Sequence, residues 1–294
     1  MRIGLVGAGA VGQSVGALLV ESGWCRELLV TSGSEVSARG LVTDLEDLTQ
    51  ITGSPVRVSV AAPEAMGVCD AVVLSPRARF TNTARADVRM AGLTANAPII
   101  AALARQLTGY TGVAVMVTNP VDIFARLFAA RSGCTRVLGI GAATDTARYR
   151  LTLARLLAVP VGAVRGHVIG EHGDAAVICA STTTVHGQVA AVPVQRVRAE
   201  LAARPRRISA GIGRTRSGPA GAVLTALTHA LGIADGVTEV SVRQEAGVWL
   251  GTPVRYTAGT PVLCPPPLDD SETAQLDAAT EKLHHAYIQL EEEI

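Results

Sequence analysis

A histidine between two carboxylates is the residue in this chain best suited to proton transfer. His172 lies in the run Gly170-Glu171-His172-Gly173-Asp174, directly after an apolar β-type stretch. This pattern favours a strand that ends in a bend and presents the imidazole. Because histidine titrates near neutral pH, it can give and take a proton in catalysis. An isolated loop histidine is more often a surface residue, so partners elsewhere in the chain decide between the two interpretations.

Asp145 and Arg148 are the partners that this histidine needs. They lie three residues apart, after a glycine connection and at the start of a predicted helix, so they share one helix face. On a surface such an ion pair contributes little to stability. Next to His172, the aspartate would orient the imidazole and stabilise its cation, and the arginine would bind a substrate carboxylate through two parallel hydrogen bonds.

The start of the chain predicts a dinucleotide site. A short apolar run leads into Gly7-Ala8-Gly9-Ala10-Val11-Gly12, and apolar residues at helical spacing follow. In this strand, turn and helix, Gly7 allows the turn, Gly9 lets the backbone approach a pyrophosphate, and Gly12 lets the helix pack on the strand. Ala10 and Val11 open the helix whose N-terminus would face the phosphates. The alternative is a glycine turn without a ligand.

Ser32 bears on the choice of cofactor. The expected second strand, at 27–31, ends at this serine, where a carboxylate that binds the adenosine ribose is usual in NAD-binding units. A serine can donate a hydrogen bond to a 2′-phosphate that a carboxylate would repel. The substitution leans towards NADP, with Arg39 either a further partner of the phosphate or a solvated helix residue. NAD stays open.

Alternating strands and helices define the fold class. Further short strands are expected at 56–60, 71–75 and 113–118, separated by helical stretches. This order implies right-handed β-α-β crossovers and a doubly wound parallel sheet of the Rossmann type, covered on both faces. Ligands bind beyond the carboxyl ends of such strands, so Ser75 and Asn119 are expected at the cofactor site. We place a dinucleotide-binding domain at 1–141 and a mixed α+β substrate domain at 142–294.

The composition excludes several other classes of protein. The chain has 294 residues, 48% of them hydrophobic and 17% charged, with a net charge of +1, and Lys282 is its only lysine. Without a basic block or a run of ~20 apolar residues, neither nucleic acid nor a membrane is an expected partner. The five cysteines are scattered, which predicts reduced, mostly buried thiols, no metal site and a cytoplasmic location.

Four ordered motifs resemble the lactate/malate dehydrogenase family. They are the glycine turn at 7–12, Val117-Thr118-Asn119-Pro120-Val121-Asp122, the segment 145–150, and the segment 170–174. The resemblance implies that His172 gives a proton to the substrate carbonyl and is paired with Asp145. It further implies that Arg148 binds the substrate carboxylate and that Asn119, before a usually cis Pro120, contacts the reacting oxygen.

The loop after Ser75 departs from the family pattern. Its four arginines suggest either capture of an anionic substrate or an ordinary solvated loop. Counted without gaps, the resemblance puts Arg79 at the specificity position, as in malate-selective members, and Arg85 at the carbonyl-polarising position. Aligning Asn96 with the family's asparagine gives the polarising role to Arg89 instead. Thr215 matches a pocket residue, between two unusual arginines.

Three hypotheses for the function follow. The first is a hydride-transferring dehydrogenase of a small 2-oxo or 2-hydroxy acid, with malate and oxaloacetate favoured, that forms a homodimer or homotetramer as the resemblance implies. The second is a reductase for a different or larger 2-oxo acid. The third, of another class, is a non-catalytic dinucleotide sensor or scaffold that has kept the fold.

Overall fold

The computed structural model describes residues 1–81, 87–245 and 247–294. Its first half alternates strands and helices: β1 (Arg2–Val6), α1 (Ala10–Val20), β2 (Glu27–Thr31), α2 (Glu35–Thr52), β3 (Arg57–Val60), η1 (Pro63–Val68), β4 (Ala71–Leu74), η2 (Met90–Gly92), α3 (Leu93–Gln106), β5 (Val113–Met116), α4 (Val121–Ser132) and β6 (Val137–Gly139). Its second half is mixed: α5 (Ala142–Leu157), η3 (Val161–Ala163), β7 (Val164–Arg165), β8 (Val168–Gly170), β9 (Ala176–Ile178), β10 (Thr184–Val185), β11 (Gln188–Val189), α6 (Val194–Ile212), α7 (Ser217–Ala230), β12 (Gly236–Arg243), β13 (Trp249–Thr257), β14 (Thr260–Leu263) and α8 (Asp270–Glu293).

One large sheet runs through the molecule. Strands β3-β2-β1-β4-β5-β6 are parallel, and β12, β13, β8 and β9 continue the sheet with antiparallel pairing. Strand β14 pairs with β13, and β11-β10-β7 form a small separate sheet. Every residue of β4 and β5 is buried, as a parallel strand covered on both faces requires. The predicted class, a Rossmann-type α/β fold followed by a mixed α+β part, is confirmed.

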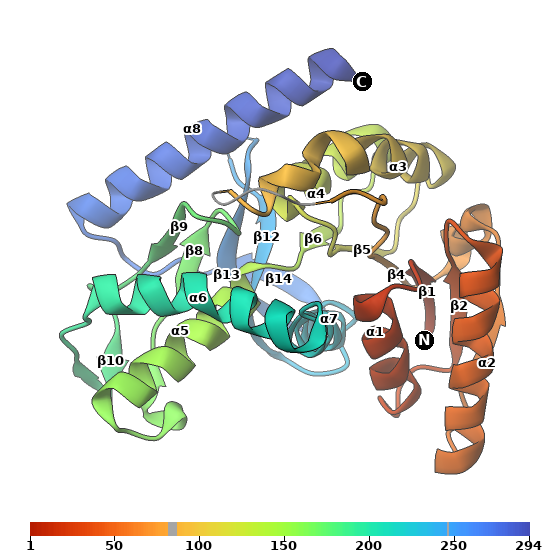
Figure 1. Ribbon diagram of the computed structural model, residues 1–294, viewed down its shortest axis with the longest axis horizontal. Helices are drawn as coiled ribbons and strands as arrows, with labels where there is room; N and C mark the ends of the chain where they lie inside the picture. Colours follow the sequence, from red (N-terminus) through yellow and green to blue (C-terminus); the bar gives the residue numbers. More distant parts are fainter. Residues whose placement is uncertain (82–86, 246) are drawn as a thin grey trace.

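Helices cover both faces of the sheet (Figure 1). One apolar core lies between the sheet and the helices α1, α2 and α7, and a second lies between the sheet and α3, α4 and α8. A smaller core joins α5 and α6 to β7, β8 and β9. The long C-terminal helix α8 thus packs against the part of the molecule where the first and second halves of the chain meet.

The start of α8 differs from the sequence expectation. The sequence predicts a final helix from about Ser271 to Leu290 with Ser271 as its cap, but Asp269 caps the helix. The Asp269 side chain accepts a hydrogen bond from the backbone of Glu272, whose carboxylate accepts one from the backbone of Asp269 in return. This reciprocal capping satisfies two backbone donors at once and therefore starts the helix two residues earlier than a cap at Ser271 would. The Glu272 carboxylate also accepts from the amide and hydroxyl of Ser181.

Two general expectations can be checked in the described part of the chain. All five cysteines are free thiols, and Cys25, Cys69, Cys134 and Cys179 are buried, as predicted. None of the helices in residues 1–81, 87–245 and 247–294 combines the length and apolar character needed to cross a bilayer.

Candidate active site

His172 follows the end of β8 in a loop that is fixed at several points. Gly170 ends the strand with a φ of 81°, a conformation that favours glycine. The backbone amide of His172 donates to Oδ2 of Asp122 at 2.8 Å. A Cβ on Gly141 would stand 2.3 Å from Cγ of His172, so glycine there is required for the ring to pack against the start of α5.

Three charged side chains surround the imidazole. Its Nδ1 lies 2.6 Å from Oδ2 of Asp145, and its Nε2 accepts a hydrogen bond of 2.9 Å from Nε of Arg89. The other Asp145 oxygen, Oδ1, lies 3.5 Å from Arg148 and 3.6 Å from Arg89. One carboxylate therefore faces two guanidinium groups, and this leaves a surplus of positive charge beside the histidine that a substrate carboxylate would balance.

Burial and charge define the protonation states of this cluster. The His172 side chain is only 9% exposed, and burial, together with the positive charge of Arg89, lowers its pKa against the opposing effect of Asp145. Burial alone would raise the pKa of Asp145, but His172 and the two arginines outweigh it, so the pKa is lowered. The free imidazole is therefore neutral, with its proton on Nδ1 facing an ionised aspartate.

Of the described residues in the loop after β4, Arg89 joins this cluster. Arg89 lies against His172 and Asp145. Arg85, the other candidate for the polarising position, lies outside the described residues. Arg79 is exposed, and within the described part of the chain no ion pair joins it to the cluster. Arg77 stacks on Phe80, 4.7 Å from the ring centroid.

Asn119 lies in the connection between β5 and α4. It follows β5, its peptide bond to Pro120 is cis, and its Oδ1 is buried without a hydrogen-bond partner in the described part of the protein. This oxygen is therefore able to accept a hydrogen bond from a bound molecule. Thr215 lies half-buried in the connection between α6 and α7. Arg214 lies in the same connection, and its charge adds to the effect of burial in lowering the pKa of Arg77.

Two residues that support the site had no role assigned to them from the sequence. Asp122 holds the His172 backbone, and burial raises the pKa of its carboxyl to about 7. Asn96, on α3, accepts from the amide of Ala78 at 2.8 Å and donates to the backbone oxygen of Asn119 at 3.3 Å, which fastens the loop after β4 to the end of β5. Asp122 belongs to the Asn-Pro-Val-Asp motif, and this motif could have indicated its role. Asn96 served in the sequence only to align the loop after Ser75 with the family.

The glycine turn is closely packed at Gly7 and Gly12 and open at Gly9. A Cβ on Gly7 or Gly12 would collide with protein backbone, 2.7 Å from Ser75 O and 1.9 Å from Gly7 O respectively, so packing requires both glycines. A Cβ on Gly9 would meet no atom within 4 Å. Helix α1 begins at Ala10 and Val11 without a side-chain cap or an acidic residue in its first turn. The open space and the free helix N-terminus fit a pyrophosphate.

A cavity of about 370 Å³ lies next to this turn. Apolar side chains of η1 and α3, including Pro63 and Ile99, form part of its lining, and Ser32 stands at the end of β2 beside it. A flat adenine ring and its ribose match such a site in chemistry. Arg39 does not face it as a free cation: it pairs with Glu35 one helical turn away, and its side chain is 70% exposed.

Fold and site together define a Rossmann-type α/β protein with a glycine turn after its first strand and a histidine that is oriented by an aspartate. The sequence model of the lactate/malate dehydrogenase NAD-binding domain matches residues 1–139. An L-lactate dehydrogenase of Treponema denticola is 33% identical over 195 residues, which are 64% of this chain and 59% of that protein. The matched region therefore spans less than two thirds of that relative.

Solved structures resemble the whole chain. Malate dehydrogenase of Cryptosporidium parvum has a TM-score of 0.89 at 22% identity and covers 99% of this chain and 100% of its own. A lactate dehydrogenase from the same organism, complexed with lactic acid and nicotinamide adenine dinucleotide, has a TM-score of 0.88 at 19% identity and covers 99% of this chain and 98% of its own. At these identities the structures establish the fold. Residues 1–139 thus match the NAD-binding domain of the lactate/malate dehydrogenase family, and the whole chain has the fold of these dehydrogenases.

Proposed function

We propose that the protein is an NAD-dependent dehydrogenase that interconverts a 2-oxo acid and the corresponding 2-hydroxy acid. The observation that carries the proposal is the contact of His172 with Asp145 on one ring nitrogen and with Arg89 on the other, beside Arg148. This arrangement provides a proton donor and acceptor together with two cations for an anionic substrate. A bound nicotinamide would accept or supply the hydride.

His172 moves the proton in this proposal. In the reducing direction, the protonated imidazole donates from Nε2 to the carbonyl oxygen of the 2-oxo acid, which becomes the hydroxyl of the product. Asp145 holds Nδ1 and stabilises the imidazolium form, while it keeps the ring in the orientation that points Nε2 at the substrate. In the oxidising direction, the neutral imidazole takes the hydroxyl proton at the same atom.

The arginines bind and polarise the substrate. Arg148 is fixed on α5 and buried to 7% exposure, so its guanidinium is well placed to bind the carboxylate through two hydrogen bonds. Arg89 lies on the Nε2 side of His172 in the free protein. With substrate bound, it would transfer its hydrogen bond from the imidazole to the carbonyl oxygen and stabilise the negative charge that develops there. The side-chain NH2 of Asn119 would donate to the same carbonyl oxygen, and its Oδ1 would accept from the hydroxyl of the 2-hydroxy acid.

The test is oxidation of NADH and NADPH with oxaloacetate, pyruvate and a bulkier 2-oxo acid, for the wild type and for His172→Asn. Asparagine cannot supply a proton, so turnover should fall by about 10³-fold while NADH fluorescence titrations change little. Retained turnover in His172→Asn would disprove the role of this residue. NADH binding without turnover of any acid would favour a dinucleotide sensor or scaffold.

NAD is the cofactor that we propose, in preference to NADP. The matching family domain is an NAD-binding one, and Arg39, on the helix that follows Ser32, pairs with Glu35. The lean of Ser32 towards NADP finds no support from these comparisons. Replacing Ser32 with Asp should tighten NADH binding and abolish the remaining NADPH binding, because two carboxylate oxygens can accept from the ribose hydroxyls and repel a 2′-phosphate.

Malate and oxaloacetate are the favoured pair, and an exposed Arg79 is the residue proposed to select them.

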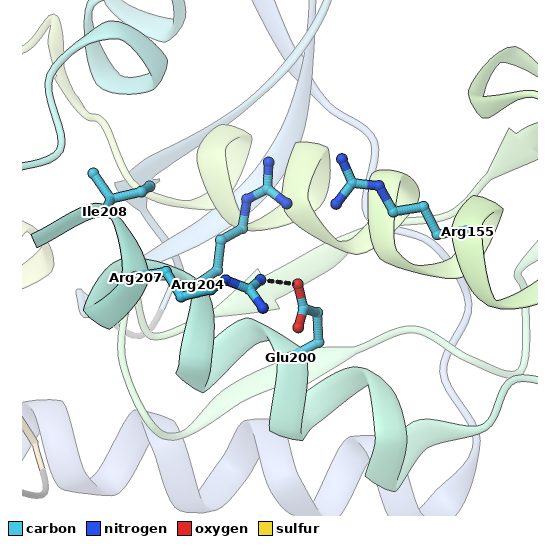
Figure 2. A pocket seen from close by; sticks show the side chains of 5 residues that line it. All are labelled: Arg155, Glu200, Arg204, Arg207 and Ile208. Atoms are coloured by element: carbon cyan, nitrogen blue, oxygen red, sulfur yellow. Dashed lines mark hydrogen bonds and ion pairs between the residues drawn. The ribbon is translucent and has the colours of Figure 1, made fainter. Parts of the chain in front are cut away.

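One further observation favours a larger, more acidic 2-oxo acid. A second cavity, of about 350 Å³, is lined by Arg155 of α5 and by Glu200, Arg204, Arg207 and Ile208 of α6. Figure 2 shows the Arg155 and Arg204 guanidinium groups on the same side of this cavity, whereas Arg207 pairs with Glu200.

The charge of Arg204 acts on Arg148, the arginine proposed to bind the substrate carboxylate. Burial lowers the pKa of Arg148, and the charges of Arg89 and Arg204 add to this effect. Arg148 and Arg155 are two helical turns apart on one face of α5, which is roughly 10 Å along the helix axis. A substrate with a second acidic group at that distance from its 2-oxo carboxylate would place that group near Arg155 and Arg204.

Substitution at 204 separates these two substrates. Arg204→Gln should raise KM for a long-chain 2-oxo dicarboxylic acid and leave KM for pyruvate unchanged. Arg207→Gln is the matched control, because Glu200 already balances the Arg207 charge. If oxaloacetate is turned over best and Arg79→Gln alone raises its KM, the larger substrate is ruled out.

Light scattering would test the proposed dimer or tetramer. Fractionation of cells would test the proposed cytoplasmic location.

A further inference from the structure

Lys282, the only lysine of the chain, connects three elements that surround His172. It lies on α8, and its Nζ donates to both carboxylate oxygens of Glu171 at 3.0 Å each. The same Nζ contacts Oδ1 of Asp87, in the segment that leads to Arg89. Glu171 directly precedes His172, so one ammonium group joins α8 to the histidine loop and to the arginine segment.

The Glu171 carboxylate is buried and depends on this contact. Its side chain is 2% exposed, against 29% for Lys282 and 47% for Asp87. Its Oε2 also accepts from the amide of Ala175 at 3.0 Å, and a Cβ on Gly173 would stand 2.4 Å from its Oε1. A buried carboxylate without a cation is strongly unfavourable, so the loss of Lys282 would release Glu171 from its position and disturb the turn around His172.

Asp87 carries the same connection to the arginine. Its backbone amide donates to Oδ2 of Asp174 at 2.9 Å, on the far side of the histidine loop. Two residues later, Arg89 contacts His172 and Asp145. The Asp87 backbone has a φ of 46°, an unfavourable conformation for a residue with a side chain, and such a conformation persists only where contacts hold it. Lys282 and Asp174 are among the contacts that hold it, together with the hydrogen bond from the amide of Met90 to the backbone oxygen of Asp87.

We infer that Lys282 is a positioning residue for the reaction: through Glu171 and Asp87 it sets the distance between the Arg89 guanidinium and Nε2 of His172. It touches neither substrate nor cofactor in this role. Because catalysis depends on geometry to within about 1 Å, loosening this connection should lower kcat by up to about 100-fold. The inference rests on the proposed function for its kinetic consequence, but the structural connection itself can be measured in the free protein.

Two variants at position 282 separate the charge of the side chain from its length. Lys282→Met keeps the length of the side chain without its charge, and Lys282→Arg keeps the charge. Lys282→Met should lower kcat with little change in the NADH dissociation constant, and Lys282→Arg should restore most of the rate. Glu281→Gln is the matched control, since Glu281 is the exposed neighbour on the same helix. A rate of Lys282→Met equal to that of the wild type would overturn the inference.

Combination with Arg89→Gln tests the route of the effect. If Lys282 acts through Arg89, the double variant should be hardly slower than Arg89→Gln alone, because one connection is lost in both. Multiplication of the two rate losses would show that Lys282 acts on general stability and would refute the positioning role. Urea unfolding of each variant, which measures stability directly, accompanies these rates.

The free protein offers a readout that does not require turnover. The charged groups facing His172 are Arg89, Asp145 and Arg148, with the Asp122 carboxyl at its backbone and Glu171 beside it. Arg89 opposes the imidazolium cation, so release of Arg89 in Lys282→Met should raise the pKa of His172, measured by NMR, towards its value in Arg89→Gln. An unchanged pKa of His172 would disprove the connection even if the proposed dehydrogenase activity is found. A raised pKa without turnover would support the connection and disprove only the proposed activity.

Discussion

The guanidinium of Arg89 donates its Nε hydrogen to Nε2 of His172 over 2.9 Å. Nε2 is the atom that would pass a proton to the substrate, so in the free protein a cation occupies the direction in which the substrate oxygen would lie. The contact requires an unprotonated Nε2, in agreement with the lowered pKa of this histidine. In the proposed reaction, the substrate would therefore displace Arg89 from the imidazole before proton transfer.

Removal of the Arg89 charge should shift the pH dependence of the reaction. Burial and Arg89 hold the pKa of His172 below its usual value, and reduction requires the protonated form, so kcat/KM for the 2-oxo acid falls as pH rises through that pKa. In Arg89→Gln the imidazolium is less opposed, so this fall should move to higher pH, while kcat drops by about 10²- to 10³-fold as polarisation of the carbonyl is lost. pH profiles of kcat/KM test both effects. Arg79→Gln, which changes an exposed arginine of the same loop, should leave the midpoint unmoved.

Replacement of Arg148 by Lys should affect the binding of the acid specifically. Lysine keeps the positive charge but cannot form two parallel hydrogen bonds to a carboxylate. The expected loss is about 2 kcal/mol, or roughly 30-fold in kcat/KM for the 2-oxo acid, with the NADH dissociation constant unchanged. Arg155→Lys, at the exposed end of the same helix, serves as the comparison for small 2-oxo acids. Equal losses for Arg148→Lys and Arg155→Lys would contradict the assignment.

Gly9 and Gly12 should respond differently to alanine. Gly9 has a φ of −79° and open space in front of it, so Gly9→Ala should change the free energy of unfolding by less than about 0.5 kcal/mol. Its methyl group would occupy the space proposed for the pyrophosphate, and NADH should bind about tenfold more weakly or worse. Gly12→Ala would push a Cβ to 1.9 Å from Gly7 O and should destabilise the fold by about 1–3 kcal/mol. Thermal melts with and without NADH distinguish the two.

Short motifs made the parallel sheet and much of the cluster predictable. The glycine turn, the Asp145 and Arg148 pair, and the histidine loop each lie within a few residues of a strand end or helix start, where local spacing fixes the geometry. The parallel topology then brings the strand ends together. The domain division at 141 and the roles of Thr215, Ser75 and the other site residues stay predictions.

Longer-range contacts were beyond the sequence pattern. Lys282 and Glu171 are 111 positions apart, and only the packing of α8 on the second half of the chain brings them together. The loop after β4 has no periodic apolar pattern, so counting along it could not choose between Arg85 and Arg89. The earlier start of α8 has a simpler cause: Asp269 competes with Ser271 for the cap and is favoured by the reciprocal bond with Glu272.

Asp122 should make the stability of the protein depend on pH. Burial raises the pKa of its carboxyl to about 7, whereas the unfolded chain releases this proton near pH 4. Between these values the folded state holds a proton that the unfolded state has lost, so the stability contributed by the neutral carboxyl is complete below about pH 4 and is lost as pH rises through 7. A shift of this size corresponds to at most about 4 kcal/mol.

Asp122→Asn isolates this effect. The asparagine oxygen can still accept the amide hydrogen of His172, but the side chain no longer titrates. The variant should therefore gain stability relative to the wild type as pH rises from 5 to 8, measured by urea unfolding at each pH. Asp44→Asn, an exposed position on α2, should show no such trend. If Asp122→Asn loses stability relative to the wild type at pH 8, the carboxylate is charged in the folded protein and binds the histidine loop as an anion.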